Sequence, residues 1–341
     1  MHELTKQIKQ EALSLNFSQC KICPAKNLDS YQKHYQAFLD QKQHGQMEYL
    51  VKHQKLKTNP NEIVANANSI ILVSLNYFQA RKDAKNWAPK IHIPDHKEGQ
   101  VARYAFGRDY HKVFRKKLKQ LSLKLSAKTS KYRFFADSGP LLERQYAELA
   151  GLGYVGKNTM LISKEYGSWI LLGEIITDAK LINDTPFDRE KMVCGSCQKC
   201  QTACPTNALS QDYKIDAQKC ISYLTIEHKG SIPEELRPKI GNWLFGCDIC
   251  QEVCPHNFRA KITREQDFIK PIAGEKLNLK EILSISNDQE YLEKFAGSPL
   301  MRAKRSKLLR NACVVASNLN RIDLIPEVKD LCQDADPIIQ E

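Results

Sequence analysis

Residues 194–205 read Cys194-Gly-Ser-Cys197-Gln-Lys-Cys200-Gln-Thr-Ala-Cys204-Pro205. Three cysteines follow one another at intervals of three residues, and a fourth stands four residues further on, directly before a proline. In bacterial iron–sulfur proteins with this spacing, the first three thiolates bind one [4Fe-4S] cluster and the fourth binds a neighbouring cluster. This stretch therefore predicts a small module built around two clusters.

A second, shorter run supplies more ligands of the same kind. It contains Cys247, Cys250 and Cys254, again followed by a proline, while Cys220 stands alone between the two runs. Because the last cysteine of each run binds the other run's cluster, eight ligands divide into two sets. One cluster is expected on Cys194, Cys197, Cys200 and Cys254. The other is expected on Cys204, Cys220, Cys247 and Cys250, with Cys220 assigned because it is the candidate that remains.

Two zinc sites are the alternative, since cysteines three residues apart also form tetrahedral zinc centres. Zinc ribbons use well-separated pairs, whereas three closely spaced cysteines followed by Cys-Pro suit a cluster with four corners. Two linked clusters in one module indicate electron transfer more than a purely structural role. A separate Cys20-x-x-Cys23 has no second pair, and it is either half a metal site, a dithiol or buried free cysteine.

Composition limits the classes of protein to be considered. The chain has 341 residues, a formal net charge of +12, 42% hydrophobic residues and 26% charged residues, which is typical of a globular protein. One core rarely exceeds about 300 residues, so several domains are expected. We assign residues 1–189 to a mixed α/β domain, 190–260 to the cluster module and 261–341 to a basic helical segment.

The sequence predicts no membrane span and a cytoplasmic location. Its longest apolar runs are far shorter than the ~20 residues that cross a bilayer. The first 17 residues lack the apolar stretch of a secretory signal. Because the cytoplasm is reducing, the 12 cysteines are expected to bind metal or serve redox chemistry rather than form disulfides.

Periodicity predicts the elements of the first segment. Residues 69–77 (SIILVSLNY) predict a buried strand, and residues 110–131 predict a helix with one apolar face. Residues 132–136, 159–163 and 168–177 predict further strands, and residues 137–140 (DSGP) predict the start of a helix that ends at Gly151. Nine lysines and arginines and no acid lie between positions 110 and 133.

Residues 151–156 (GLGYVG) match the GxGxxG pattern of dinucleotide-binding loops. That pattern requires a strand before it and a helix after it. Here the predicted helix comes first and strand-like residues follow. We therefore interpret the loop as the end of a helix that leads into a strand.

Several further stretches occur together in a fixed order. They are residues 101–112 (VARYAFGRDYHK), 137–144 (DSGPLLER), 150–158 (AGLGYVGKN), 166–168 (YGS) and 298–299 (SP). With the cysteine block, they make the chain resemble the epoxyqueuosine reductases, which are cobalamin-dependent iron–sulfur enzymes related to reductive dehalogenases. The resemblance implies an α/β (α+β) cobalamin-binding domain, a ferredoxin-like module with two [4Fe-4S] clusters, and a short C-terminal helical, HEAT-like segment.

The implied reaction reduces epoxyqueuosine to queuosine at the wobble position of tRNA, the last step of queuosine biosynthesis. The epoxide becomes an alkene and water is released, which consumes two electrons and two protons. The clusters would pass electrons to cobalamin, and the cofactor would carry the chemistry at the epoxide. The resemblance makes Asp137 the proton donor, whereas the residue pattern alone allows a helix cap at this position.

The resemblance also implies residues that contact cobalamin. They are Lys57, Arg103, Tyr104, Asp137, Leu161, Ile162, Ser163, Leu172 and Ser222. Lys57 stands where the family commonly has arginine, so the positive charge is kept but the two-pronged hydrogen bonding of arginine is lost. The chain has no Asp-x-His-x-x-Gly motif, so no histidine ligand to cobalt is expected.

The tRNA is expected to bind basic residues near the C-terminus. Residues 301–310 (MRAKRSKLLR) hold five lysines and arginines and no acid, and phosphate neutralisation supplies most non-specific affinity for nucleic acid. The candidates are Arg302, Lys304, Arg305, Lys307 and Arg310. A solvated helix face is the alternative. Longer family members end in helical repeats that grip tRNA, so a smaller grip is expected here.

The same residues favour some partners and functions over others. We expect a monomer that receives electrons from a low-potential donor. A reductase of a small halogenated substrate would use the same cofactors, but such enzymes are usually exported with a twin-arginine signal. A non-catalytic iron–sulfur electron carrier or RNA-binding module would leave Asp137 and the glycine-rich loop without a role. A flavin- or NAD-linked oxidoreductase is disfavoured by the missing strand before Gly151.

Overall fold

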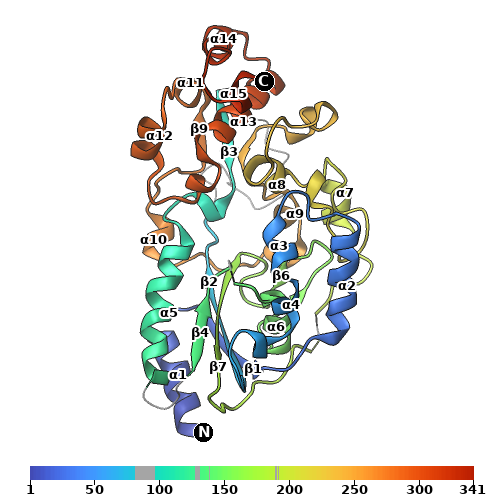
Figure 1. Ribbon diagram of the computed structural model, residues 1–341, viewed down its shortest axis with the longest axis vertical. Coiled ribbons are helices and arrows are strands. Elements are labelled where there is room, and N and C mark those ends of the chain that lie inside the picture. Colours follow the sequence, from blue (N-terminus) through green and yellow to red (C-terminus); the bar gives the residue numbers. More distant parts are fainter. Residues whose placement is uncertain (81–96, 127–130, 138, 189, 191) are drawn as a thin grey trace.

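The computed structural model describes residues 1–80, 97–126, 131–137, 139–188, 190 and 192–341. Its central feature is a four-stranded antiparallel sheet in the order β1-β2-β7-β4 (Figure 1). The strands are β1 (Gln19–Pro24), β2 (Ser69–Asn76), β7 (Ile170–Thr177) and β4 (Tyr132–Phe135). The predicted mixture of helices and strands in the first segment is confirmed.

Helices cover both faces of this sheet. On one face, α1 (His2–Ser14) and α5 (Tyr110–Ser126) enclose an apolar core that includes Phe114 and Leu118. On the other face, α6 (Glu143–Leu149) encloses a second core around Tyr146. Because both faces are covered, every residue of β2 is buried. This explains why residues 69–77 form a continuous apolar run rather than an alternating one.

The predicted basic helix is α5, whose apolar residues Phe114, Leu118, Leu121 and Leu125 are fully buried. It is described as far as Ser126, and residues 127–130 of the prediction lie outside the described residues.

The start predicted for the next helix is wrong. Helix α6 begins at Glu143 and its N-cap is Leu142, so Asp137 caps no helix. Asp137 instead has a left-handed backbone with φ 57°. Gly151, with φ +83°, ends the helix as predicted. The reason for the miss is that an Asp-Ser-Gly-Pro sequence suits a turn as well as a helix start.

The GxGxxG stretch, residues 151–156, follows α6 and contains the strand β5 (Tyr154–Val155), which pairs with β6 (Leu161–Ile162). The predicted order, with a helix before the glycine-rich stretch and strand residues after its first glycines, is confirmed. Gly153 is needed for a close approach, because a Cβ at this position would clash with the carbonyl oxygen of Ile162.

A second sheet links distant parts of the chain. Its order is β8-β3-β9, with β8 (Trp243–Phe245) parallel and β9 (Lys276–Asn278) antiparallel to β3 (Glu98–Val101). One strand comes from each of the segments 1–189, 190–260 and 261–341. The three-part division stays a prediction, and this sheet ties the three parts together.

Short helices surround the cysteines and build the C-terminal end. The cysteine segment contains α7 (Lys199–Ala203), α8 (Ile221–Ile226) and α9 (Ile249–Glu252), and the N-terminal helices α2 (Asp29–Asp40), α3 (Glu48–Lys52) and α4 (Gln54–Thr58) lie on the same side (Figure 1). The N-terminal helical region contacts the cysteine segment through, among others, a hydrogen bond of 2.8 Å from the Ala217 N–H to the Gln43 carbonyl.

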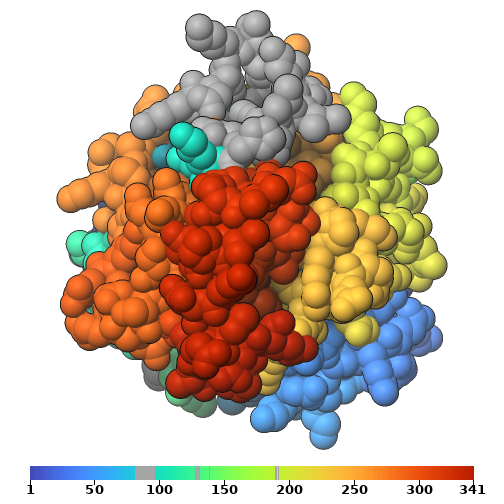
Figure 2. Space-filling view, turned by 90° about the horizontal axis from the view of Figure 1, so that it is seen from above, coloured from blue at the N-terminus to red at the C-terminus, as the bar shows by residue number. Residues whose placement is uncertain are grey.

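The C-terminal segment is helical as predicted, apart from β9. It contains α10 (Gln266–Ile269), α11 (Leu279–Leu283), α12 (Asp288–Phe295), α13 (Lys304–Asn318), α14 (Ile325–Leu331) and α15 (Pro337–Gln340). Helices α11 to α15 pack with the small sheet in one core, whereas Phe268 of α10 belongs to the core under α1 and α5. Figure 2 shows the C-terminal helices at the end of the molecule beside the cysteine segment. Among the described residues, no helix is sufficiently long and apolar to cross a membrane.

Short 3-10 helices connect these elements. They lie at Pro60–Glu62, Arg103–Ala105, Ala217–Lys219, Glu234–Leu236, Pro238–Ile240, Pro255–Asn257, Pro299–Arg302 and Ile322–Leu324.

Candidate iron–sulfur and proton-transfer site

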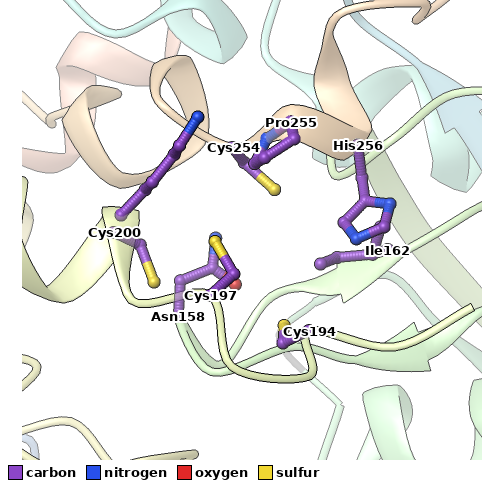
Figure 3. Close-up of a pocket in the computed structure, with 9 residues that line it drawn as sticks. Asn158, Ile162, Cys194, Cys197, Cys200, Cys254, Pro255 and His256 are labelled. Atoms are coloured by element: carbon purple, nitrogen blue, oxygen red, sulfur yellow. The ribbon is translucent and has the colours of Figure 1, made fainter.

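Four cysteines from the two runs surround one small hollow (Figure 3). They are Cys194, Cys197, Cys200 and Cys254, the set that the sequence assigns to one cluster. Cys200 belongs to α7, and Cys254 follows α9. The four cysteines that the sequence spacing assigns to one cluster therefore lie together, although they come from chain segments more than 50 residues apart.

Neighbouring groups contact the sulfur of Cys194. The backbone N–H of Lys157 donates a hydrogen bond of 3.4 Å to it, and the Tyr154 hydroxyl lies 3.8 Å away. Tyr154 lies in β5 and Lys157 follows it closely, so the glycine-rich stretch lies against the cysteines. Hydrogen bonds to cluster sulfurs tune the reduction potential of an iron–sulfur centre.

The other four predicted ligands form a second group. Burial raises the pKa of Cys250 well above its usual value, and the charges of Cys220, Cys200 and Cys204 raise it further. Burial and then Cys250 do the same to the pKa of Cys247. These electrostatic effects connect the four thiols of this set, and they also reach Cys200 of the first set. A buried thiol stays protonated without metal, whereas a coordinated thiol is deprotonated by the positive ion.

The donor set fits clusters of several irons. In the described part of the chain, no three His, Cys, Asp or Glu side chains stand close enough together to hold one metal ion. The sulfurs of the first set instead stand around the hollow, pointing toward it (Figure 3). In a [4Fe-4S] cluster each thiolate binds a different iron, so such an arrangement suits it.

Asp137 follows β4 and its side chain is 53% exposed. The hydroxyl of Tyr110 donates a short hydrogen bond to its Oδ2, and the His111 Nε2 lies 3.7 Å from the same oxygen. Both partners belong to the first turn of α5. A helix therefore holds an acid that remains accessible to a reactant.

Charge in this region is concentrated around His111. Burial lowers the pKa of His111, but the hydrogen bond and charge of Asp109 and the charge of Asp137 outweigh it, so the pKa rises above its usual value. The His111 Nδ1 lies 2.8 Å from the Asp109 carboxylate. A protonated imidazole is thereby favoured beside Asp137.

Lys57, a predicted cofactor contact, is buried and points toward the Asp137 loop. Its Nζ donates a hydrogen bond of 3.3 Å to the Gly139 carbonyl. Burial lowers the pKa of Lys57, and the carboxylates of Glu143, Glu174 and Asp137 oppose that shift.

Glu143 and Glu174 are not among the residues predicted from the sequence. A signal was present for Glu174, because it is the one charged residue in the apolar strand Ile170–Thr177. Its proximity to Asp137 depends on the packing of distant elements.

Arg103 and Tyr104 lie where the domain built on the four-stranded sheet meets the cysteine segment. The Arg103 guanidinium is buried, and its Nη1 forms ion pairs with Asp248 at 3.2 Å and Glu252 at 2.6 Å. It also stacks over Trp169 at 4.8 Å. The Tyr104 ring packs edge-on against Tyr110 at 6.0 Å. Arg103 therefore joins the sheet domain to the cysteine segment.

The remaining predicted cofactor contacts lie in three places. They are Leu161, Ile162 and Ser163 on and after β6, Leu172 in β7, and Ser222 in α8 beside Cys220. Strand β6 is one edge of a two-stranded ribbon, so backbone donors and acceptors along its outer side face away from β5. Such groups fit a cofactor with carboxamide arms, which need both donors and acceptors.

The structure divides the predicted tRNA residues into two groups. Arg305 and Arg310 are buried: Arg305 is paired with Asp334, and Arg310 donates to backbone carbonyls such as that of Gly230 at 2.6 Å. These two guanidinium groups face the protein interior and cannot reach an RNA phosphate. The prediction that they contact tRNA is therefore wrong. Their role is to hold the C-terminal helices in place.

The other three predicted tRNA residues lie nearer the surface. Arg302 is 60% exposed and pairs with Glu227 at 2.8 Å, Lys304 is exposed, and Lys307 is half-buried against the Ile226 carbonyl.

A wide, open hollow lies between α5 and β4, next to the Asp137 loop. It is lined by cationic and aromatic side chains together with two aliphatic ones: His111, Arg115, Leu118, Tyr132, Arg133, Phe134, Phe135 and Ala136. The sequence indicated the positive charge of this stretch but not the hollow.

The open question about Cys20 and Cys23 is answered by β1. Cys20 packs with the core under α1 and α5, whereas Cys23 belongs to the core under α6. The two side chains therefore lie on opposite faces of the sheet and are no chelating pair. Burial raises the pKa of each to about 12, which is typical of unreactive thiols.

Known families match this site and fold. A family model described as a 4Fe-4S double cluster binding domain matches residues 193–257, and one described as "Epoxyqueuosine reductase QueG, DUF1730" matches residues 57–138. The first match agrees with the predicted ligand block and favours iron–sulfur clusters over zinc sites. Fold and site together define an iron–sulfur oxidoreductase with two [4Fe-4S] clusters beside an α/β domain.

Individual relatives identify the family. The epoxyqueuosine reductase of Escherichia coli (strain K12) is 39% identical over 322 residues, covering 93% of this chain and 82% of the relative. That of Pseudomonas aeruginosa is 40% identical over 317 residues, covering 92% and 85%. The chain belongs to the epoxyqueuosine reductase family.

Solved structures agree with this assignment. Epoxyqueuosine reductase from Bacillus subtilis, with its catalytic aspartate loop swung out of the active site, matches with a TM-score of 0.87 and 32% identity over 99% of this chain and 88% of that chain. An epoxyqueuosine reductase bound to an epoxyqueuosine-modified tRNA stem loop matches with a TM-score of 0.86, 32% identity and the same coverage, 99% and 88%. A catabolic reductive dehalogenase matches with a TM-score of 0.43 and 14% identity, which supports no conclusion about this chain.

Proposed function

We propose that this protein reduces epoxyqueuosine in tRNA to queuosine. The observation that carries the proposal is the combination, in one chain, of two cysteine ligand sets and an accessible acid, Asp137, held by Tyr110. One relative with the same fold was solved with an epoxyqueuosine-modified tRNA stem loop. The reaction turns the epoxide into an alkene and water, consuming two electrons and two protons.

The two clusters would be held by the two cysteine sets, and each would carry single electrons. Cobalamin, when bound against β6, Leu172 and Ser222, would supply the reducing centre at the epoxide. Lys57 and Tyr104 are proposed to contact that cofactor. Arg103 is proposed to act indirectly, because its ion pair with Asp248 holds the cysteine segment in place.

Asp137 is the proposed proton donor to the epoxide oxygen. A general acid must lie within hydrogen-bond reach of the atom it protonates. The half-exposed carboxyl meets that condition for a nucleotide entering from solvent. Tyr110 fixes its orientation by the hydrogen bond to Oδ2, and the imidazole of His111 provides compensating positive charge nearby.

The tRNA is proposed to meet the basic side chains that remain exposed. Arg302, Lys304 and Lys307 lie at the start of the C-terminal helices, and Arg115 and Arg133 line the hollow beside Asp137. Cations bind the phosphates, and aromatic side chains of that hollow could stack on unpaired bases. We also propose a HEAT-like helical pair, a monomer, a low-potential electron donor and a cytoplasmic location.

Nucleoside mass spectrometry tests the function directly. The protein is reconstituted anaerobically with iron, sulfide and cobalamin, then given epoxyqueuosine-containing tRNA and a strong reductant. A product lighter by one oxygen is expected. It should be absent without cobalamin and strongly reduced in Asp137→Asn.

An unchanged nucleoside would refute the tRNA assignment if absorbance shows intact clusters and bound cobalamin. The protein would then be better explained as a reductase of a small substrate.

A further inference from the structure

Two carboxyl groups lie buried behind the Asp137 loop. Glu174 comes from the central strand β7 and is fully buried, and Glu143 is the first residue of α6. Both Oε atoms of Glu174 and the Oε2 of Glu143 are buried and have no hydrogen-bond partner among the described residues. A buried carboxylate without a partner is strongly unfavourable, so the pair has a physical reason to keep a proton.

Both carboxyls contact the loop that carries the proposed proton donor. Glu143 accepts a hydrogen bond from the backbone N–H of Asp137. Glu174 lies against Gly139, since a Cβ built on that glycine would stand 2.5 Å from its Oε1. Lys57 holds the same residue through its hydrogen bond of 3.3 Å to the Gly139 carbonyl. The loop is therefore supported by a buried group that can gain or lose a proton.

Charges around the pair do not neutralise it. Asp137, Lys57 and Arg144 are the charged groups that face it, and Tyr110 lies in the same cluster. Arg144, which donates to the Thr159 carbonyl, and Lys57 both oppose the rise in the pKa of Glu143, and Lys57 also opposes that of Glu174. Burial, and then the charge of Asp137, raise the pKa of Glu143 to about 8, and burial raises that of Glu174 well above its usual range.

We propose that Glu143 and Glu174 hold one exchangeable proton between them and return it to Asp137 during the reaction. The inference rests on the proposed function, in which the epoxide oxygen takes up two protons. Asp137 gives the first proton and becomes a carboxylate. The glutamate pair reprotonates it, directly or through a water, so that the oxygen can leave as water. Solvent then restores the proton of the pair, and the two electrons come from the donor that feeds the clusters.

Neither glutamate touches the substrate in this scheme, so both act through Asp137. Two consequences separate proton storage from simple support of the loop. Turnover should fall as the pH rises through about 8, since Glu143 then loses the proton that the pair exchanges. The protein without substrate should also contain a protonated carboxylic acid at neutral pH.

The test uses the full chain, loaded with clusters and cobalamin, and the variants Glu143→Gln and Glu174→Gln. Glutamine keeps the hydrogen-bond acceptor for the Asp137 N–H but stores no exchangeable proton. Glu148→Gln is the matched control, because Glu148 is a buried glutamate of the same helix. The rate of queuosine formation is measured between about pH 6 and about pH 9.

We expect at least about tenfold slower turnover in each of the two variants. We also expect their pH profiles to lack the fall near pH 8, while the control resembles the unaltered protein. Infrared difference spectra in H2O and D2O should show a carboxylic acid C=O band in the unaltered protein that disappears in Glu174→Gln.

Unchanged rates and pH profiles in both variants, or absence of that band at neutral pH, would overturn the proposal. The infrared measurement decides it even if a variant fails to fold, because it is made on the unaltered protein. Failure of the proposed function is a different result, in which the unaltered protein forms no queuosine whatever the state of the glutamates.

Discussion

At the scale of single residues, the proposed chemistry depends on how Asp137 is held. The residue has a left-handed backbone, and its side chain is anchored by the Tyr110 hydroxyl. Tyr110 is itself fixed, because its ring stacks on His111 at 4.1 Å and meets Tyr104 edge-on at 6.0 Å. The geometry of the proton donor is thus set by aromatic packing that the variant Tyr110→Phe would leave in place.

Tyr110→Phe is therefore expected to lower kcat about tenfold with little change in KM, because the acid loses orientation while the binding surface is kept. Steady-state rates of queuosine formation give both constants. Tyr291→Phe is the control, since it also removes a buried hydroxyl, the one that donates 2.6 Å to the Leu300 carbonyl. The control should lose about 1 kcal/mol of stability and no activity. Equal activity of both variants would contradict the role given to Tyr110.

At the scale of elements, the sheet domain and the cysteine segment are joined by a buried ion pair. Arg103 reaches Asp248, which directly follows the proposed cluster ligand Cys247, and Glu252 in α9. Because Arg103 and Asp248 are almost fully buried, removing the arginine leaves a charge without compensation in the interior. The same pair thus connects the position of the ligands to the packing of the sheet.

Arg103→Ala should cost about 3 to 5 kcal/mol of unfolding free energy and reduce iron retention. The exposed pair of Arg302 with Glu227 is the comparison, and Arg302→Ala should cost about 0 to 1 kcal/mol. Anaerobic denaturant titrations and iron analysis measure both effects. Similar losses in the two variants would show that the buried pair is no structural link.

The same scale shows what the sequence could and could not predict. Helix α5 and strand β2 have long, regular apolar patterns, and both were predicted. The small sheet was missed, because β8 and β9 have three residues each and are paired through β3, which is more than 140 residues away from either. Glu143 and Glu174 were missed for the related reason that only tertiary packing brings them to Asp137.

At the scale of the whole molecule, each predicted set of cluster ligands combines cysteines from both runs. The sequence predicted the grouping from the spacing rule, and the hollow around Cys194 contains the four cysteines of one set. Arg305 and Arg310 show the opposite case: their basic stretch indicated RNA binding, yet burial assigns them to the interior. Linear charge does not reveal which face of a helix a side chain occupies.

The grouping of the ligands is testable by combining substitutions. Cys254→Ala should reduce the iron content from two clusters to about one, because a cluster keeps only three ligands. Adding Cys197→Ala should remove little more, since both cysteines belong to one set, whereas adding Cys250→Ala should remove the second cluster as well. Cys332→Ala, an exposed cysteine outside both sets, should leave iron unchanged. The opposite order of the double variants would show that the exchange between the runs is wrong.

The proposed RNA surface makes a prediction about salt. Binding of a tRNA anticodon stem loop should weaken as salt rises, because cations of the protein displace counterions from phosphate. Lys304→Gln removes an exposed charge from the first residue of α13 and should reduce the slope of log affinity against log salt by about 1. Lys6→Gln removes an equally exposed lysine from α1, at the opposite end of the molecule (Figure 1), and should leave the slope unchanged. Fluorescence anisotropy at several salt concentrations measures both, and equal slopes would place the RNA away from the C-terminal helices.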